Sequence, residues 1–169
     1  MESNLWISEN AEDIKGDVLS IGSYSDKDSE GNFYRDYFRA ANSYTTSDID
    51  GRAQLKLDIR DMSSITDERY DCLFVSGVLE HVDDFHKAIS EMTRILKPNG
   101  TLLLGVPFRQ PIHMGEQDFW RFTKNALEYL FNKNFNIQEI KEIYPEIHNF
   151  PISYWMKAEK YGQSKNAKL

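Results

Sequence analysis

Side chains capable of proton transfer follow two apolar segments of the chain. His81 comes shortly after the apolar run 70–75, and His113 and Asp118 come shortly after the run 100–108. Imidazole and carboxylate groups are the side chains that most often exchange a proton near neutral pH. If the two runs are neighbouring parallel strands, these residues reach one edge of a sheet, where one of them could deprotonate a hydroxyl or an amine.

These residues could also have roles other than proton transfer. His81 could orient the loop after its strand as readily as it could transfer a proton, and Glu80 is a weaker candidate for chemistry. His113, Glu116 and Asp118 could together supply three metal ligands, but we give this interpretation less weight than proton transfer.

The elements that position these residues are strands and helices in alternation. Residues 17–21, 70–75 and 100–108 are apolar on both faces, as in covered strands, and are closed by Gly, Ser or Pro. Residues 83–96 carry apolar side chains at helical spacing. A strand, helix and strand in this order form a right-handed parallel unit, so we expect an α/β fold whose ligands bind at the carboxyl ends of the strands.

Weaker patterns predict the remaining elements. Two strands are expected at 42–48 and 53–59, joined by a turn too short to hold a helix. A helix with a threonine cap is expected at 123–134, followed by an edge strand at 135–143. Residues 152–160 could pair with that strand in antiparallel fashion.

Size and charge narrow the class of protein. The 169 residues, 40% of them hydrophobic, predict one domain over 1–169 with its core at about 16–160 and a frayed tail at 161–169. The net charge of −7 disfavours a nucleic-acid partner. The single Cys72 excludes an internal disulfide and favours a cytoplasmic location. Because no apolar segment reaches the roughly 20 residues that span a bilayer, we expect no membrane partner.

Two longer segments resemble a known family. The run YDCLFVSGVLEHVDDFHKAISEMTRILKPNGTLLLGVPF (70–108) resembles the middle of class I S-adenosylmethionine-dependent methyltransferases of the small-molecule type. HMGEQDFWRFT (113–123) resembles the His...Asp-aromatic-Trp-Arg-Phe-Thr segment of one subgroup, often found among surface polysaccharide genes. With FYRDYF (33–38), the similarity covers about 16–135. It implies a three-layer Rossmann-like fold, with a mostly parallel sheet and an antiparallel C-terminal strand.

The resemblance implies S-adenosyl-L-methionine as the cofactor and places its methionine end beside the first strand. The family usually has an acidic residue and several glycines there, whereas this chain has Ser20 and only Gly22. Ser20 can accept a hydrogen bond but carries no charge. Ser76 and Gly77, just past the fourth strand, would line the same end of the cofactor.

The resemblance also places the adenosine part. Asp48 matches the carboxylate that accepts the two ribose hydroxyls, with Asp50 as the second candidate. Asp58 and Ile59 match the adenine position, where a carboxylate accepts from the exocyclic amine and a backbone amide binds a ring nitrogen. The ordinary alternatives are a strand-ending turn for Gly22, a solvated turn for Asp48 and a capping loop for Asp58.

The implied activity is methyl transfer to a hydroxyl or amine of a sugar-like or other small polar acceptor. His113 is the first candidate for the general base, followed by Asp118 and His81. The family segment carries no metal requirement, so no metal is expected. The alternative is a scaffold or binding protein whose degenerate first loop has lost the chemistry. The short stretch before Lys15 leaves little chain to cap the cofactor cleft. We therefore expect a site that is open, suited to a bulky acceptor, or completed by a second subunit in a homodimer.

Overall fold

A seven-stranded sheet forms the centre of the molecule. The computed structural model describes residues 2–113, 115–144 and 150–162. The strands are β1 (Asp17–Ile21), β2 (Ser43–Asp48), β3 (Leu55–Lys56), β4 (Tyr70–Ser76), β5 (Leu96–Pro107), β6 (Phe135–Ile143) and β7 (Ser153–Lys160). Their order in the sheet is β3-β2-β1-β4-β5-β7-β6. Neighbours from β3 to β5 are parallel, and β7 is antiparallel to β5 and β6. The α/β fold predicted from the sequence is confirmed.

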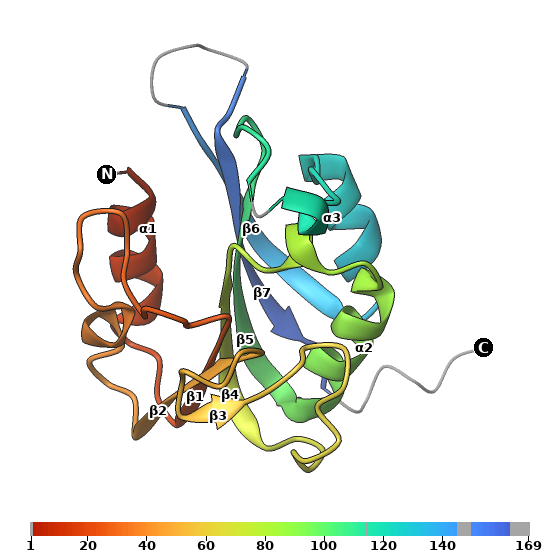
Figure 1. Cartoon of the computed structure of the whole chain (residues 1–169). Helices are drawn as coiled ribbons and strands as arrows, with labels where there is room; N and C mark the ends of the chain where they lie inside the picture. The colour runs from red at the N-terminus through yellow and green to blue at the C-terminus, as the bar shows by residue number, and fades with distance from the viewer. Residues whose placement is uncertain (1, 114, 145–149, 163–169) are drawn as a thin grey trace.

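Helices cover both faces of the sheet. The described helices are α1 (Glu2–Ala11), α2 (Phe85–Ile95) and α3 (Lys124–Phe131), with the 3-10 turns η1 (Tyr34–Tyr37), η2 (Leu79–His81) and η3 (Gly115–Gln117). Figure 1 shows α1 on one side of the sheet and α2 and α3 on the other. The threonine cap predicted for α3 is present, because the Thr123 side chain accepts a hydrogen bond from the Ala126 amide.

The alternation of side chains along each strand divides the core in two. On β4, Leu73 and Val75 belong to the cluster packed beneath α2 and α3. Cys72 and Phe74 point to the opposite face and join the cluster that includes α1. Because both faces of the strand are buried, β4 has the continuous apolar pattern that identifies it in the sequence.

Two features differ from the sequence prediction, and a third differs from the usual connection between parallel strands. The strand predicted at 53–59 is limited to Leu55–Lys56, although Leu57 and Ile59 beyond it are buried. Helix α1 was not predicted, and it buries Trp6 against Trp155 with ring centroids 5.7 Å apart. Residues 22–42, between β1 and β2, contain only the short turn η1 where a crossover helix is usual.

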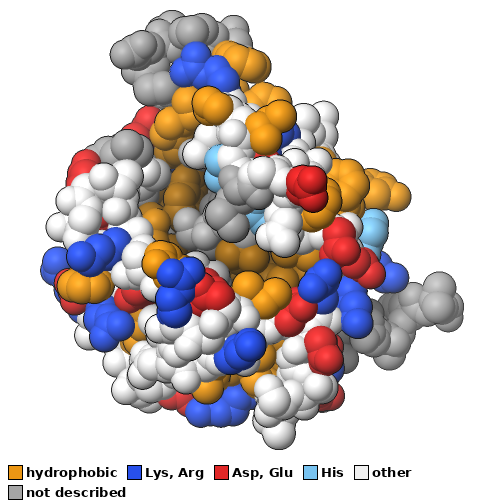
Figure 2. All heavy atoms as spheres, in the orientation of Figure 1, with side chains coloured by type: hydrophobic (Ala, Val, Ile, Leu, Met, Phe, Trp, Pro, Cys, Tyr) orange, Lys and Arg blue, Asp and Glu red, His pale blue; other side chains and the backbone are white. Residues whose placement is uncertain are grey.

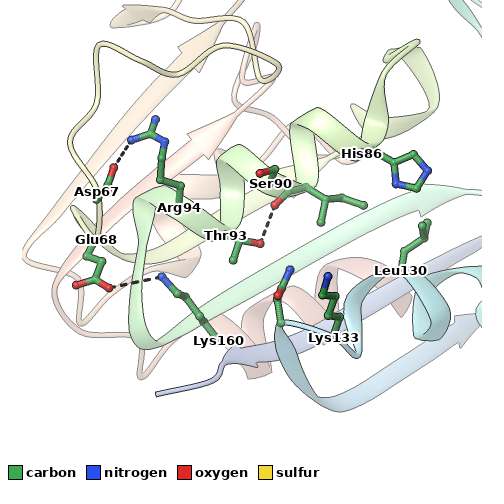
Figure 3. A pocket seen from close by; sticks show the side chains of 11 residues that line it. Asp67, Glu68, His86, Ser90, Thr93, Arg94, Leu130, Lys133 and Lys160 are labelled. Carbon is green, nitrogen blue, oxygen red and sulfur yellow. Dashed lines mark hydrogen bonds and ion pairs between the residues drawn. The ribbon is translucent and has the colours of Figure 1, made fainter. Parts of the chain in front are cut away.

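A groove of about 810 Å³ runs between α2 and α3 (Figure 3). Charged side chains in it form ion pairs with one another, namely Arg94 with Asp67 at 2.7 Å and Lys160 with Glu68 at 3.9 Å. Glu68 lies just before β4, so one end of the groove is near the amino ends of the parallel strands. That end is opposite to the edge at which α/β proteins bind ligands.

None of the described helices combines the length and the hydropathy that a membrane span requires.

Candidate active site

The residues singled out in the sequence meet at the carboxyl edge, the edge of the sheet at which the parallel strands end. A cavity of about 120 Å³ lies there between the loop after β1 and the end of β4. Ser20, Gly22 and Ser76 line it, as the resemblance implied for the methionine end of the cofactor. Pockets for whole ligands usually measure about 300–1,000 Å³, so this cavity fits one end of a cofactor and not all of it.

Close packing between two loops fixes one side of the cavity. Gly22 has a φ of +75°, and a Cβ built on it would lie 2.3 Å from Cγ2 of Val78. Any other residue at position 22 would therefore be strained and would collide with the loop after β4. Gly77, in that second loop, also has a positive φ of +66°. The glycine in the degenerate first loop is thus required by the contact between the two loops.

The floor of the cavity is a buried hydrogen-bond network. Ser20 is 2% exposed, and its hydroxyl oxygen accepts a hydrogen bond from Ser23. The Tyr44 hydroxyl interacts with Ser20, and burial raises the pKa of this phenol. Tyr34, on the other side of the cavity, interacts with Ser76. Polar side chains therefore line the cavity from both of the strands that border it, β1 and β4.

A buried carboxylate that the sequence analysis did not single out also lines the cavity. Asp26 is 5% exposed and has a φ of +49°. It accepts hydrogen bonds from the Tyr44 hydroxyl at 2.8 Å and from Nε of Arg35 at 3.3 Å. Since Tyr44 also contacts Ser20, Asp26 places a negative charge close to the position where the family usually has its acidic residue.

Tyr24, which stands where the family has small residues, lines the cavity but is largely exposed. Its side chain is 53% exposed, and the guanidinium of Arg52 lies 3.4 Å from the centre of its ring. Arg52 also forms an ion pair with Asp50, and the hydrogen bonds from Arg52 lower the pKa of Asp50. This contact joins the loops after β1 and β2 at the rim of the cavity.

The two predicted adenosine-binding carboxylates differ in their surroundings. Asp48 ends β2 and accepts a hydrogen bond from the amide of Asp50 at 3.1 Å. Both oxygens of Asp58 bind the guanidinium of Arg60, at distances of 2.7 to 3.2 Å. That pairing lowers the pKa of Asp58. Ile59 is buried in the core. The carboxylate of Asp58 is thus already paired with Arg60, and Asp48 is the more available partner for a ribose.

The structure brings both candidate histidines together. The rings of His81 and His113 lie edge to face, with their centroids 4.8 Å apart. Nδ1 of His81 lies 2.9 Å from the carbonyl oxygen of Gln117. Nδ1 of His113 lies 3.3 Å from Oδ2 of Asp118. The two rings are therefore positioned by contacts from the same segment, 113–118.

Asp118 and Arg121 form a two-point ion pair beneath His113. Nη1 and Nη2 of Arg121 lie 2.5 and 2.7 Å from the two carboxylate oxygens. The hydrogen bonds from Arg121 hold the pKa of Asp118 far below its usual range. A carboxylate held so firmly in its anionic form is a poor base, so Asp118 is better suited to orient His113 than to accept a proton.

A larger hollow adjoins the histidine pair. It has a volume of about 600 Å³ and is lined by residues 108–112 and 118–121, which include Phe119 and Trp120. The indole nitrogen of Trp120 donates to the carbonyl oxygen of Val82 at 2.9 Å, which ties this segment to the loop after β4. Figure 2 shows a hollow in this face of the molecule, with hydrophobic and histidine side chains at its border.

Comparison with known proteins agrees with this geometry. Residues 32–104 match a family model described as a methyltransferase domain. Among solved structures, the fold is similar to the 1,6-didemethyltoxoflavin-N1-methyltransferase of Burkholderia thailandensis, with a TM-score of 0.70 and 15% identity over 95% of this chain and 82% of that one. The chain has the methyltransferase fold.

Other solved methyltransferases share this fold. The N-methyltransferase NodS of Bradyrhizobium japonicum has a TM-score of 0.68 and 15% identity, over 94% of this chain and 84% of that one. The CurJ carbon methyltransferase has a TM-score of 0.66 and 16% identity over 88% of this chain, which spans 50% of that protein. No curated protein sequence matches the chain. Together, the match over residues 32–104 and these structures show that the chain shares the fold of solved methyltransferases.

Proposed function

We propose that this chain transfers a methyl group from S-adenosylmethionine to a hydroxyl or amine of a sugar-like or other small polar acceptor. The observation that carries the proposal is the position of the small cavity and the histidine pair on one edge of the sheet. Val78, which contacts Gly22 beside the cavity, is only three residues before His81. A donor held in the cavity and an acceptor beside the histidines would therefore be neighbours.

The cofactor would be held by residues from three loops. Ser20, Gly22, Ser76 and Gly77 surround the methionine end, and the carboxylate of Asp26 pairs with its ammonium group. This assignment replaces the missing acidic residue of β1 with one from the following loop. It also explains why an uncharged side chain is tolerated at position 20.

The adenosine would lie along the open edge beyond the cavity. Asp48 accepts from the ribose hydroxyls, and the chain at Asp58 and Ile59 borders the adenine. Because Arg60 already binds the Asp58 carboxylate, we assign most of the polar binding energy of this part to Asp48.

Methyl transfer is an in-line displacement that needs little more than positioning. A lone pair of the acceptor oxygen or nitrogen forms a bond to the methyl carbon while the carbon–sulfur bond breaks. The electron pair of the broken carbon–sulfur bond stays on sulfur, which becomes a neutral thioether. The acceptor proton passes to Nε2 of His113, whose Nδ1 is oriented by Asp118. His81 is the second candidate for this role.

The acceptor class rests on the hollow beside the histidines and on the subgroup resemblance of 113–123. Phe119 and Trp120 provide aromatic surface of the kind that stacks on sugar rings, and Arg109 in the same hollow suits an acceptor with an anionic group. A role in surface polysaccharide synthesis, a cytoplasmic location and a homodimer are parts of the same proposal. Sedimentation at micromolar concentration would detect the dimer.

The second candidate is a binding or scaffold protein that retains the fold without the chemistry. The observation in favour of a scaffold is the small volume of the cavity, about 120 Å³. Cofactor affinity separates the two candidates, because a scaffold without a functional first loop would not bind S-adenosylhomocysteine tightly.

The proposed activity can be tested with S-adenosylmethionine carrying a labelled methyl group. The full chain is incubated with a panel of sugars, sugar nucleotides and small amines, and label is followed into the products. Replacing His113 by Ala should lower transfer at least about 100-fold, as expected for a general base. His86→Ala is the matched control, because His86 is exposed on α2 and lines neither the cavity nor the hollow. Unchanged turnover in the His113 variant would remove His113 from this role.

A further inference from the structure

Three side chains at the carboxyl edge have the arrangement of a metal site. Glu80 and His81 belong to η2 after β4, and His113 follows β5. One ligand atom from each of them lies within 4.8 Å of the other two. Two histidines and one carboxylate are a common ligand set for Zn²⁺ and for other divalent transition metals.

Glu80 gives an independent indication of a missing ligand. The residue is 1% exposed, and its Oε2 has no hydrogen-bond partner among the described residues. Its other oxygen, Oε1, lies 3.7 Å from Nε2 of His81. A buried carboxylate oxygen without a partner is strongly unfavourable, and such groups usually pair with a cation or coordinate a metal.

Both histidines are oriented as metal ligands usually are. Nδ1 of His81 lies 2.9 Å from the carbonyl oxygen of Gln117, and because a carbonyl only accepts, this nitrogen must carry the proton. Nδ1 of His113 lies 3.3 Å from Oδ2 of Asp118 and 3.2 Å from the carbonyl oxygen of Pro111, which favours the same tautomer. Each ring then keeps the lone pair on Nε2, as in metal-binding histidines whose second nitrogen donates to a carboxylate or carbonyl.

We propose that Glu80, His81 and His113 bind one divalent transition metal ion such as Zn²⁺, with an open coordination position toward the adjoining hollow. Bonds of about 2.0–2.1 Å in tetrahedral geometry bring ligand atoms to roughly 3.3 Å from one another. The present spacing must therefore shrink by up to about 1.5 Å, which small rotations of the side chains provide.

This ligand set differs from the one considered in the sequence. Of the residues weighed there with His113, Asp118 is bound on both oxygens by Arg121, and Glu116 is exposed. The proposed ion also uses the Nε2 lone pair that accepts the proton in the proposed methyl transfer. A metal ion and a proton are thus alternative ligands of that atom, and the metal site does not depend on the methyltransferase activity.

The test is direct titration of the full chain, freed of metal with a chelator, with Zn²⁺ alone. We expect one ion per chain with micromolar or tighter affinity, and a visible spectrum of a low-coordinate site when Co²⁺ is used instead. Glu80→Gln keeps the shape of the side chain and removes its charge, so it should weaken Zn²⁺ binding by about 10- to 100-fold or more, as should His113→Ala. Glu116→Gln and His86→Ala should bind as the wild type does.

Two outcomes would overturn the metal site. One is the absence of stoichiometric binding by a chain whose circular dichroism and melting show that it is folded. The other is equal affinity in the wild type and in Glu80→Gln. S-adenosylhomocysteine binding by the same metal-free chain is measured in parallel, so that failure of the metal site and failure of the proposed methyl transfer are distinguished.

Discussion

The imidazole rings of His81 and His113 lie edge to face at a centroid distance of 4.8 Å, although they follow different strands. Their proximity results from the parallel pairing of β4 with β5, which places the loops after both strands on one edge of the sheet. Phe119 and Trp120 strengthen this contact, because their amides donate to the carbonyl oxygen of Glu80 at 2.8 and 3.2 Å. The candidate base is thus held by backbone contacts as well as by its own side chain.

Replacing Gly22 by Ala should damage both stability and cofactor binding. A residue with a Cβ at positive φ loses about 1–2 kcal/mol, and the collision with Val78 adds to that loss. Gly31→Ala is the matched control, because Gly31 has a φ of +88° but no atom within 4 Å of the added carbon. The two variants are compared by urea unfolding and by calorimetry with S-adenosylhomocysteine.

The double variant Gly22→Ala with Val78→Ala tests the collision itself. It should recover part of the stability lost in the single variant at position 22. Equal losses in Gly22→Ala and Gly31→Ala would show that the contact between the two loops is unimportant.

Asp26→Asn should weaken S-adenosylhomocysteine binding by about 10-fold or more, since a hydrogen bond to a charged group contributes about 1.5–3 kcal/mol. Asparagine tolerates the positive φ of this position, so the loop should keep its shape. Asp36→Asn, on the exposed side of η1, serves as the control. Unchanged affinity in the Asp26 variant would contradict its assignment to the cofactor's ammonium group.

Asp48→Asn and Asp58→Asn should differ in their effects on affinity. The first should lower S-adenosylhomocysteine affinity by about 10-fold or more through weaker hydrogen bonds to the ribose. The second should lower it less than about 3-fold, because Arg60 already binds the carboxylate. Calorimetric titration of both variants with S-adenosylhomocysteine measures these affinities. A larger loss of affinity in Asp58→Asn than in Asp48→Asn would contradict the assignment of most of the polar binding energy to Asp48.

Acid should destabilise the loop after β1 through Asp28. Although burial opposes it, hydrogen bonds from Tyr37, Asn32 and backbone amides lower the pKa of Asp28 from its ordinary 3.8. The folded state therefore gains stability from this carboxylate above pH 3.8, and the gain is lost as the pH falls through the lower folded pKa. The stability difference between wild type and Asp28→Asn, measured by urea unfolding, should shrink over that range. A difference independent of pH would refute this role.

Much of the fold could be predicted from local patterns. The alternation in 135–143 identifies the edge strand β6, and the continuous apolar run at 70–75 identifies β4, which is buried on both faces. Helix α1 was missed because its sequence ESNLWISENA has few apolar residues, and Trp6 is buried only by contact with the distant Trp155. The strand at β3 was predicted too long because buried residues beyond it resemble a strand.

The site was harder to predict than the fold. Asp26 lies in a polar loop that reads as a solvated turn, and only its distant contacts with Tyr44 and Arg35 show that it is buried. Glu80 was given little weight because no local pattern reveals that one of its oxygens lacks a partner among the described residues. In both cases the environment of a carboxylate is set by segments far away in the chain, which periodicity cannot detect.

Calorimetric titration of the full chain with S-adenosylhomocysteine tests the central claim most directly. We expect one molecule bound per chain with micromolar affinity, which corresponds to about 8 kcal/mol of binding free energy. Millimolar affinity, or no heat of binding from a folded chain, would show that the carboxyl edge does not hold the cofactor and would leave the scaffold function in its place.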